Sequence, residues 1–363
     1  MKRIQVSLKE NSYPIFIGNG ILDQLEMLLE KYQANKNLLF IVDKNVEKAN
    51  PGKLKNCIPS GTKKLNFYYL QPGEKSKSYL ELNRIYSFLL KNNYGRDTTI
   101  VSAGGGVTGD LAGYAAATFM RGVQIVHIPT TLLAAVDSSI GGKTGINFEK
   151  KKNMIGAFYQ PKFVLIDTDL LKTLPSPELT SGFGEIIKYA YLADEKFFSY
   201  VTDNYHEIFK YNSDVLQKII YDSAAIKAAV VSQDEKESGL RKILNLGHTF
   251  AHAFETKLNF KIKHGEAVDA GIIAALFLSN NTGLLKTSTL TDLISLPLKI
   301  KIPAKIKGLE KEDLFNIMLH DKKNRNERIK FVLLSGIGKI ILDAEAGKKE
   351  VFQSLSRMEK IIH

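Results

Sequence analysis

A glycine-rich segment, GGGVTGD at residues 104–110, is the feature that most constrains what this chain can fold into. It follows a short β-branched and apolar run, residues 98–102, and precedes an alanine-rich segment, residues 111–119. Glycines let a backbone approach a ligand closely, and the free N–H groups at the start of a helix face an anion. The order strand, glycine turn, helix therefore predicts a phosphate-binding loop in an α/β sheet.

Further apolar runs extend that sheet. Runs of strand character occupy residues 38–42, 65–70, 98–102 and 123–128. Helical spacing of apolar residues occurs between them, at residues 79–90 and 111–119. This alternation predicts a parallel sheet that helices cover on both faces.

The second half of the chain has a different pattern. Helical spacing dominates residues 176–320, notably at 183–192, 215–232, 249–257 and 267–276, before a last strand signal at 329–334. The chain's 363 residues exceed the roughly 250–300 at which single cores stop growing. We therefore expect an α/β N-terminal nucleotide-binding domain with a parallel sheet at residues 1–173. A mostly α-helical C-terminal metal- and substrate-binding domain should follow at residues 174–363.

Composition excludes several classes of protein. The net charge is +12, but basic residues are scattered and runs such as Lys150-Lys151-Lys152 are short, which disfavours a nucleic-acid binder. The single cysteine, Cys57, permits no intrachain disulfide. No stretch approaches the ~18–20 apolar residues of a membrane span, and no signal-peptide pattern opens the chain. We expect a cytoplasmic enzyme with no nucleic-acid or membrane partner.

Carboxylates and lysines at strand ends suggest which ligand the glycine loop binds. Asp43 ends the first apolar run, where a carboxylate can accept hydrogen bonds from ribose, and Glu74 and Lys77 follow another run. Asp137 and Lys143 lie among small residues in the low-charge stretch 130–145, which is suited to close packing around a ligand. Each of these residues could also be an ordinary turn residue or a surface ion pair.

Three of the seven histidines cluster at positions 248, 252 and 264. His248 and His252 are four residues apart, so they share a helix face. Glu185 is the leading distant acid, in an apolar helix and near Lys188. Imidazoles with a carboxylate suit zinc or a similar divalent ion. Spacing alone leaves open which two histidines bind, and HTFAH lacks the glutamate of a zinc-protease motif.

Five motifs in this order closely resemble the 3-dehydroquinate synthase family. They are GGGVTGD at 104–110, DSSIGGKTG at 137–145, GEIIK at 184–188, LNLGHTFAH at 244–252 and HGEAV at 264–268. The resemblance extends from Asp43 to residues 321–323. It implies one divalent metal, normally zinc with cobalt possible, bound by Glu185, His248 and His264, so that His252 becomes a substrate-side residue.

The resemblance also implies a tightly held NAD and a homodimer. Expected NAD-binding residues are Asp43, Glu74, Lys77, Gly105, Gly106, Val107, Gly109, Asp110, Thr130, Thr131, Lys143 and Lys152. Expected catalytic residues are Lys143, Asp137, Lys188 and His252, with Asp137 orienting Lys143 or a hydroxyl. Expected contacts to a phosphorylated sugar acid are Arg121, Lys152, Asn153, Lys227, Arg241 and Asn245.

The reaction that the family carries out belongs to the shikimate pathway. It converts 3-deoxy-D-arabino-heptulosonate 7-phosphate to 3-dehydroquinate by transient oxidation with NAD, phosphate elimination, re-reduction and aldol cyclisation. Two alternatives stay open, namely another sugar phosphate cyclase and a metal-dependent polyol dehydrogenase. His127, Ala251, Asp269 and the glycine-free run 324–328 depart from the usual pattern, and whether Lys322 or Lys323 reaches the substrate is open.

Overall fold

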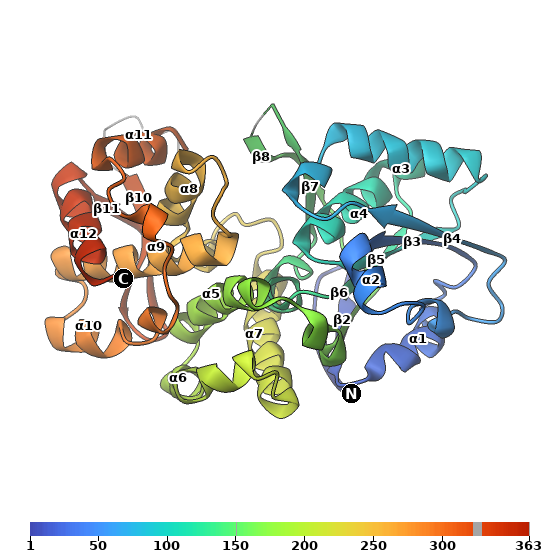
Figure 1. Cartoon of the computed structure of the whole chain (residues 1–363), viewed down its shortest axis with the longest axis horizontal. Helices are drawn as coiled ribbons and strands as arrows, with labels where there is room; N and C mark the ends of the chain where they lie inside the picture. Colours follow the sequence, from blue (N-terminus) through green and yellow to red (C-terminus); the bar gives the residue numbers. More distant parts are fainter. Residues whose placement is uncertain (150, 322–328, 363) are drawn as a thin grey trace. The chain divides into compact units, whose positions relative to one another are not determined.

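The computed structural model describes residues 1–149, 151–321 and 329–362, with the backbone alone for Asp321. Lys322, Lys323 and the run 324–328 lie outside the described residues. The chain forms two compact units (Figure 1). Met1–Pro175 and Tyr211–Lys236 make the first unit, and Ser176–Lys210 and Glu237–His363 make the second. Where one boundary after residue 173 was expected, the chain leaves the first unit after Pro175 and later returns to it.

A seven-stranded sheet forms the centre of the first unit. From edge to edge its strands are β1 (Lys2–Val6), β2 (Tyr13–Gly18), β9 (Val164–Asp167), β6 (Gln124–Pro129), β5 (Thr98–Gly104), β3 (Asn37–Asp43) and β4 (Lys64–Leu70). Neighbouring strands are parallel except β1 and β2. The four predicted strands correspond to β3, β4, β5 and β6, and the parallel α/β fold is confirmed.

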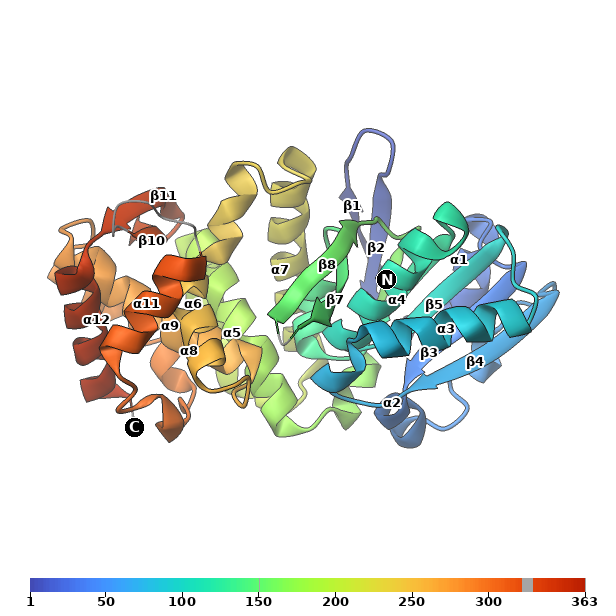
Figure 2. The same ribbon diagram turned by 90° about the horizontal axis from the view of Figure 1, so that it is seen from above.

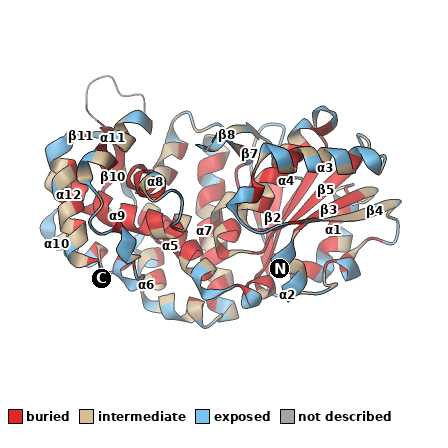
Figure 3. Ribbon diagram, turned by 45° about the horizontal axis from the view of Figure 1, so that its top comes forward, coloured by how far each residue is buried: buried red, intermediate tan, exposed pale blue. Residues whose placement is uncertain are grey.

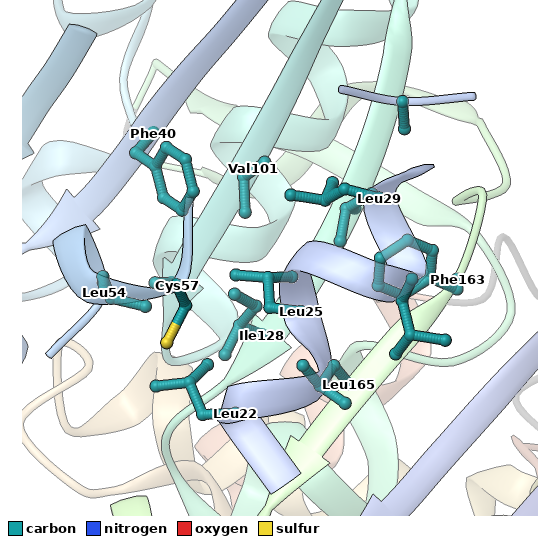
Figure 4. Close-up of a cluster of buried hydrophobic side chains, with 14 of the residues drawn as sticks. Leu22, Leu25, Leu29, Phe40, Leu54, Cys57, Val101, Ile128, Phe163 and Leu165 are labelled. Atoms are coloured by element: carbon teal, nitrogen blue, oxygen red, sulfur yellow. The ribbon is translucent and has the colours of Figure 1, made fainter. Parts of the chain in front are cut away.

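Helices cover both faces of this sheet (Figure 2). Successive strand residues point to opposite faces. Phe40 therefore packs with Leu25 of α1 (Leu25–Lys31) in one apolar cluster, shown in Figure 4. Leu39 packs on the other face with α3 (Tyr79–Lys91) and α4 (Gly106–Thr118). The central strands are consequently buried almost throughout (Figure 3).

Three more elements complete the first unit. The helix α2 (Lys44–Ala49) follows β3, and β7 (Lys143–Phe148) pairs with β8 (Lys151–Phe158) in an antiparallel hairpin. The helix α7 (Ser213–Gln233) packs on β1 and β2. Ser7 N donates to Ser232 Oγ at 2.9 Å, which ties the start of the chain to this distant helix. The predicted helix at 215–232 is therefore real, but it belongs to the first unit.

The second unit is mostly helical. Its helices are α5 (Ser176–Leu192), α6 (Glu195–Phe209), α8 (His248–Lys257), α9 (His264–Asn281), α10 (Thr287–Leu293), α11 (Lys311–Asp321) and α12 (Lys348–Ile361). The strands β10 (Ile329–Gly336) and β11 (Lys339–Ala346) form an antiparallel hairpin. The buried helix α9 is central, because α5, α8, α12 and β10 all pack against it. No helix within the described ranges has the length and apolarity needed to cross a bilayer.

Candidate active site

Three side chains that could hold a metal ion meet in the second unit. Glu185 lies within α5, while His248 and His264 are the first residues of α8 and α9. Gly247 precedes His248 in the left-handed conformation, with φ 79°, and so starts α8 at that histidine. No helical turn precedes the first residue of a helix, so the two imidazoles at the starts of α8 and α9 can both face α5.

The distances fit one shared ion. His248 Nε2 lies 3.5 Å and His264 Nε2 lies 3.2 Å from the same oxygen, Glu185 Oε1. One ligand atom from each of the three residues lies within 4.8 Å of the others. Of the histidine pairs that the spacing left open, the structure brings His248 and His264 together with Glu185. His252 lies outside this cluster, on the exposed side of α8, with its ring centroid 5.7 Å from that of His248.

Buried charge in this cluster also favours a cation. The Glu185 side chain is 1% exposed, and Lys188 Nζ lies 2.5 Å from its Oε2. Among the described residues none donates an aligned hydrogen bond to either oxygen of Glu185, so both oxygens keep acceptor capacity. A buried carboxylate in this state is stabilised by coordination to a metal. Two imidazoles and one carboxylate are a donor set that zinc and related ions accept.

The protonation of the three candidate ligands follows from their neighbours. Burial raises the pKa of Glu185, but Lys188 and the two imidazoles outweigh burial and hold this pKa well below its usual value. Burial lowers the pKa of His248, and Glu185 opposes that shift only in part. Burial also lowers the pKa of His264, but Glu185 and Glu255 more than compensate and raise it to about 10. An ionised Glu185 and a neutral His248 are the forms that bind a metal, whereas a metal ion would have to displace a proton from His264.

Two further predicted site residues, Arg241 and Asn245, directly precede α8 in the chain. Arg241 belongs to the short helix Leu240–Asn245 and is 1% exposed. At the end of that helix, Asn245 Nδ2 donates to Glu237 Oε1 at 2.8 Å. A buried guanidinium is suited to a carboxylate or phosphate ligand.

The glycine loop of the first unit has the expected placement. Gly105 caps α4 at the carboxyl end of β5, so Gly106 and Val107 are the first residues of the helix, with Gly109 one turn on. Thr130 N donates to Gly104 O at 2.9 Å, which holds the end of β6 beside the loop. A side chain at Gly105 would press on Thr131, at 3.0 Å from its Cγ2. Glycine at position 105 therefore lets the loop pack closely against Thr131.

A buried lysine, itself a predicted cofactor-binding residue, links two other predicted site residues. Lys77 is 4% exposed, lies 2.5 Å from Asp110 Oδ2 and also donates to Asn153 Oδ1. Burial raises the pKa of Asp110, and the charge of Lys77 opposes that shift. Nearby, Asn147 Nδ2 donates to Glu74 Oε1 at 2.7 Å. Asp43 caps α2 by accepting a hydrogen bond from Asn45 N at 2.8 Å.

A second buried lysine holds Asp137. Lys227 of α7 lies 2.9 Å from Asp137 Oδ1 and donates to Asp137 O at 2.8 Å. Asp137 lies in a π-helical turn, Ala134–Ser138, of a kind often found at functional sites. We expected Asp137 to orient Lys143 or a hydroxyl, and the structure pairs it with Lys227. Lys143 begins β7 with an exposed side chain, Lys152 is half-buried in β8, and Arg121 is exposed in a left-handed turn with φ 65°.

Two acidic residues at these sites were not anticipated from the sequence. Glu255 lies 3.5 Å from His264 Nδ1, and Glu237 accepts the hydrogen bond of Asn245. Glu255 could have been found, because it follows His248 by two helical turns and so shares its face of α8. No spacing signal indicates Glu237, which lies in an irregular segment with φ 59°.

Known proteins match this chain along nearly its whole length. A family model described as 3-dehydroquinate synthase N-terminal matches residues 67–181, and its C-terminal counterpart matches residues 182–324. A 3-dehydroquinate synthase from Ruminiclostridium cellulolyticum is 40% identical over 353 residues, which cover 96% of this chain and 98% of the relative.

Solved structures share the fold. A 2-deoxy-scyllo-inosose synthase, complexed with carbaglucose-6-phosphate, NAD⁺ and Co²⁺, has a TM-score of 0.87 at 25% identity, over 98% of this chain and 99% of that one. A 2-epi-5-epi-valiolone synthase from Streptomyces hygroscopicus, with NAD⁺ and Zn²⁺ bound, has a TM-score of 0.87 at 23% identity, over 98% of each chain. The two family models and the full-length relative establish that this chain belongs to the 3-dehydroquinate synthase family.

Proposed function

We propose that this chain is a 3-dehydroquinate synthase, which converts 3-deoxy-D-arabino-heptulosonate 7-phosphate into 3-dehydroquinate and inorganic phosphate. A relative of that name is 40% identical over almost the whole chain. The observation that carries the proposal is the cluster of His248 and His264 at the buried Glu185, with Lys188 beside it. Such a cluster serves a reaction in which negative charge develops on substrate oxygens.

Two groups from outside the chain take part in the proposed reaction. When bound, NAD supplies a reversible hydride acceptor, and a divalent metal on Glu185, His248 and His264 supplies a Lewis acid for hydroxyl oxygens. The metal is zinc or cobalt in this proposal. We also propose a homodimer, a cytoplasmic location and a role in the shikimate pathway.

The first unit binds the nucleotide and phosphate oxygens in this proposal. Gly105, Gly106 and Val107 offer backbone N–H groups to the diphosphate of NAD, with the positive end of α4 behind them. Lys143, Lys152 and Lys227 supply cationic donors to the substrate phosphate. These donors stabilise the phosphate as its C–O bond breaks and the neighbouring C6 proton is removed. The leaving phosphate itself accepts that proton, so the site needs no separate carboxylate base.

The second unit orients the carbon skeleton of the substrate. Arg241, buried and planar, binds the carboxylate in this proposal, and Asn245 is held by Glu237 to donate to a hydroxyl. Lys188 and His252 are the remaining site residues of this unit in the proposal, and Lys188 keeps Glu185 ionised. A carboxylate subsite is what separates this substrate from those of neutral sugar phosphate cyclases.

One assay distinguishes the proposed function from its rivals. The protein is incubated with the heptulosonate phosphate, substoichiometric NAD and Zn²⁺, and both phosphate and dehydroquinate are measured. Equal yields of the two products, each exceeding the NAD added, are expected because NAD is regenerated in every turnover. Accumulation of NADH would indicate a polyol dehydrogenase. Phosphate release from glucose 6-phosphate, but not from the heptulosonate, would indicate another sugar phosphate cyclase.

A further inference from the structure

The two imidazoles of the metal cluster have different partners on their outer nitrogens. His248 Nδ1 lies 3.2 Å from a neutral acceptor, the backbone oxygen of Leu246. His264 Nδ1 lies 3.5 Å from a carboxylate oxygen, Glu255 Oε1. In both rings Nε2 is the nitrogen that faces Glu185. The side chains therefore share one orientation, but only His264 is backed by a negative charge.

Glu255 is buried, so its contact with His264 is not a solvent-exposed ion pair. Its side chain is 4% exposed, and it lies on the same face of α8 as His248, two turns later. The helix α8 thus carries one metal ligand in its first turn and the neighbour of the second ligand in its last. Burying a carboxylate has a cost unless it is paired, and here His264 pairs with it.

We propose that Glu255 is a positioning residue for the metal ligand His264. Its carboxylate accepts the proton of His264 Nδ1, which fixes the tautomer that leaves Nε2 free for the ion and makes the imidazole a stronger donor. Glu255 itself does not join the ligand cluster, whose members are Glu185, His248 and His264. The inference rests on the proposed metal site and extends it to a residue behind that site.

Metal affinity, measured apart from activity, tests this role. The full-length protein is stripped with a chelator and titrated with Co²⁺, using visible absorption and competition with a metal-binding dye. We expect Glu255→Ala to raise the Kd for Co²⁺ by roughly 10–100-fold, the usual effect of removing such a partner. Glu255→Gln, whose amide oxygen can still accept the Nδ1 proton, should raise the Kd by less than Glu255→Ala does.

A second carboxylate provides the matched control. Glu178 lies 2.5 Å from the ammonium group of Lys263, the residue directly before His264, and does not contact the ring. Glu178→Gln should leave the Kd for Co²⁺ within about twofold of the wild-type value, because exposed ion pairs contribute little. Thermal unfolding of the metal-free variants reports any general loss of structure separately.

The outcomes separate this inference from the proposed function. If the wild-type protein binds Co²⁺ and both Glu255 variants bind it equally well, the positioning role is wrong and the metal site stands. If the Glu255 variants lose affinity only in proportion to a loss of metal-free stability, the residue is merely structural. If the wild-type protein binds no Co²⁺, the metal site and the inference fail together.

Discussion

Gly184 and Gly265 pack backbone against backbone, and each is the direct chain neighbour of a candidate metal ligand. A Cβ atom added to Gly184 would lie less than 3.0 Å from the carbonyl oxygen of Gly265. A Cβ atom on Gly265 would meet the backbone of Ser181 in the same way. The approach of α5 to α9, and with it the distance from Glu185 to His264, is thus set by the absence of two side chains.

Disrupting the contact between Gly184 and Gly265 should weaken metal binding and lower stability together. We expect Gly184→Ala to force α5 and α9 apart and to lower the free energy of unfolding by at least the ~1–3 kcal/mol typical of overpacking. The Kd for Co²⁺ should rise in the same variant. Gly336→Ala, where the nearest atom to an added Cβ is 3.6 Å away, is the control and should change neither quantity. Equal behaviour of the two variants would contradict this role for Gly184.

Two histidine variants distinguish the alternative ligand sets. His264→Ala should remove most of the bound metal, as measured by elemental analysis after gel filtration, because it deletes one of three ligands. His252→Ala should retain the metal, since His252 lies outside the cluster. It should lose turnover, since His252 is an expected catalytic residue. Loss of metal from His252→Ala, with retention in His264→Ala, would restore the i, i+4 pair His248/His252 as the site.

Lys227 should be essential for turnover. Its side chain is 7% exposed and holds Asp137 through both carboxylate and backbone oxygens. We expect Lys227→Met to lower kcat/KM for phosphate release by about 100-fold or more, because a buried charge partner and a phosphate donor are lost together. Lys218→Met, on the same helix and paired with Asp222 at the surface, should remain near the wild-type rate. A Lys227→Met rate close to that of Lys218→Met would remove Lys227 from the site.

His127 should make the protein sensitive to mild acid. Burial lowers its pKa from 6.5 to about 4, so between these values the unfolded chain binds a proton that the folded chain does not. Its contribution is fully present above pH 6.5 and is lost as the pH falls toward 4. Between pH 7.5 and 5 the loss is about 2 kcal/mol of unfolding free energy. His127→Gln should flatten this dependence in urea titrations, whereas replacing the exposed His206 should not.

Asp269 should make the protein less stable as the pH rises, the opposite of the effect of His127. It is fully buried in α9, neither carboxylate oxygen has a hydrogen-bond partner among the described residues, and burial raises its pKa well above the ordinary value. The folded chain therefore holds a proton that the unfolded chain releases, and stability falls as the pH rises above about 4. Asp269→Asn should be more stable than wild type at pH 8 and nearly equal to it at pH 4. No difference at pH 8 would mean that the carboxylate is solvated or paired.

The sequence was most informative where the structure restricts which residue types can occupy a position. The apolar runs of β3 and β5 and the glycine loop between β5 and α4 were all evident, because burial on both sheet faces and close ligand approach restrict residue type. The choice between His252 and His264 could not be made from spacing. It depends on where two helices begin, and hence on glycine contacts between segments that are about 80 residues apart. The ion pair of Asp137 with Lys227 could not be foreseen for the same reason, since the two residues lie 90 residues apart in the chain.

The return of α7 to the first unit has a consequence for how the protein is made. A ribosome that has synthesised the chain through Pro175 has delivered every strand of the large sheet, but α7, which packs on β1 and β2, comes later. Two helices of the other unit, α5 and α6, must emerge before it. The first unit therefore cannot finish folding until part of the second unit, α5 and α6, has been synthesised. Its nascent sheet must wait with β1 and β2 uncovered, a stage at which a chaperone would find exposed apolar surface to bind.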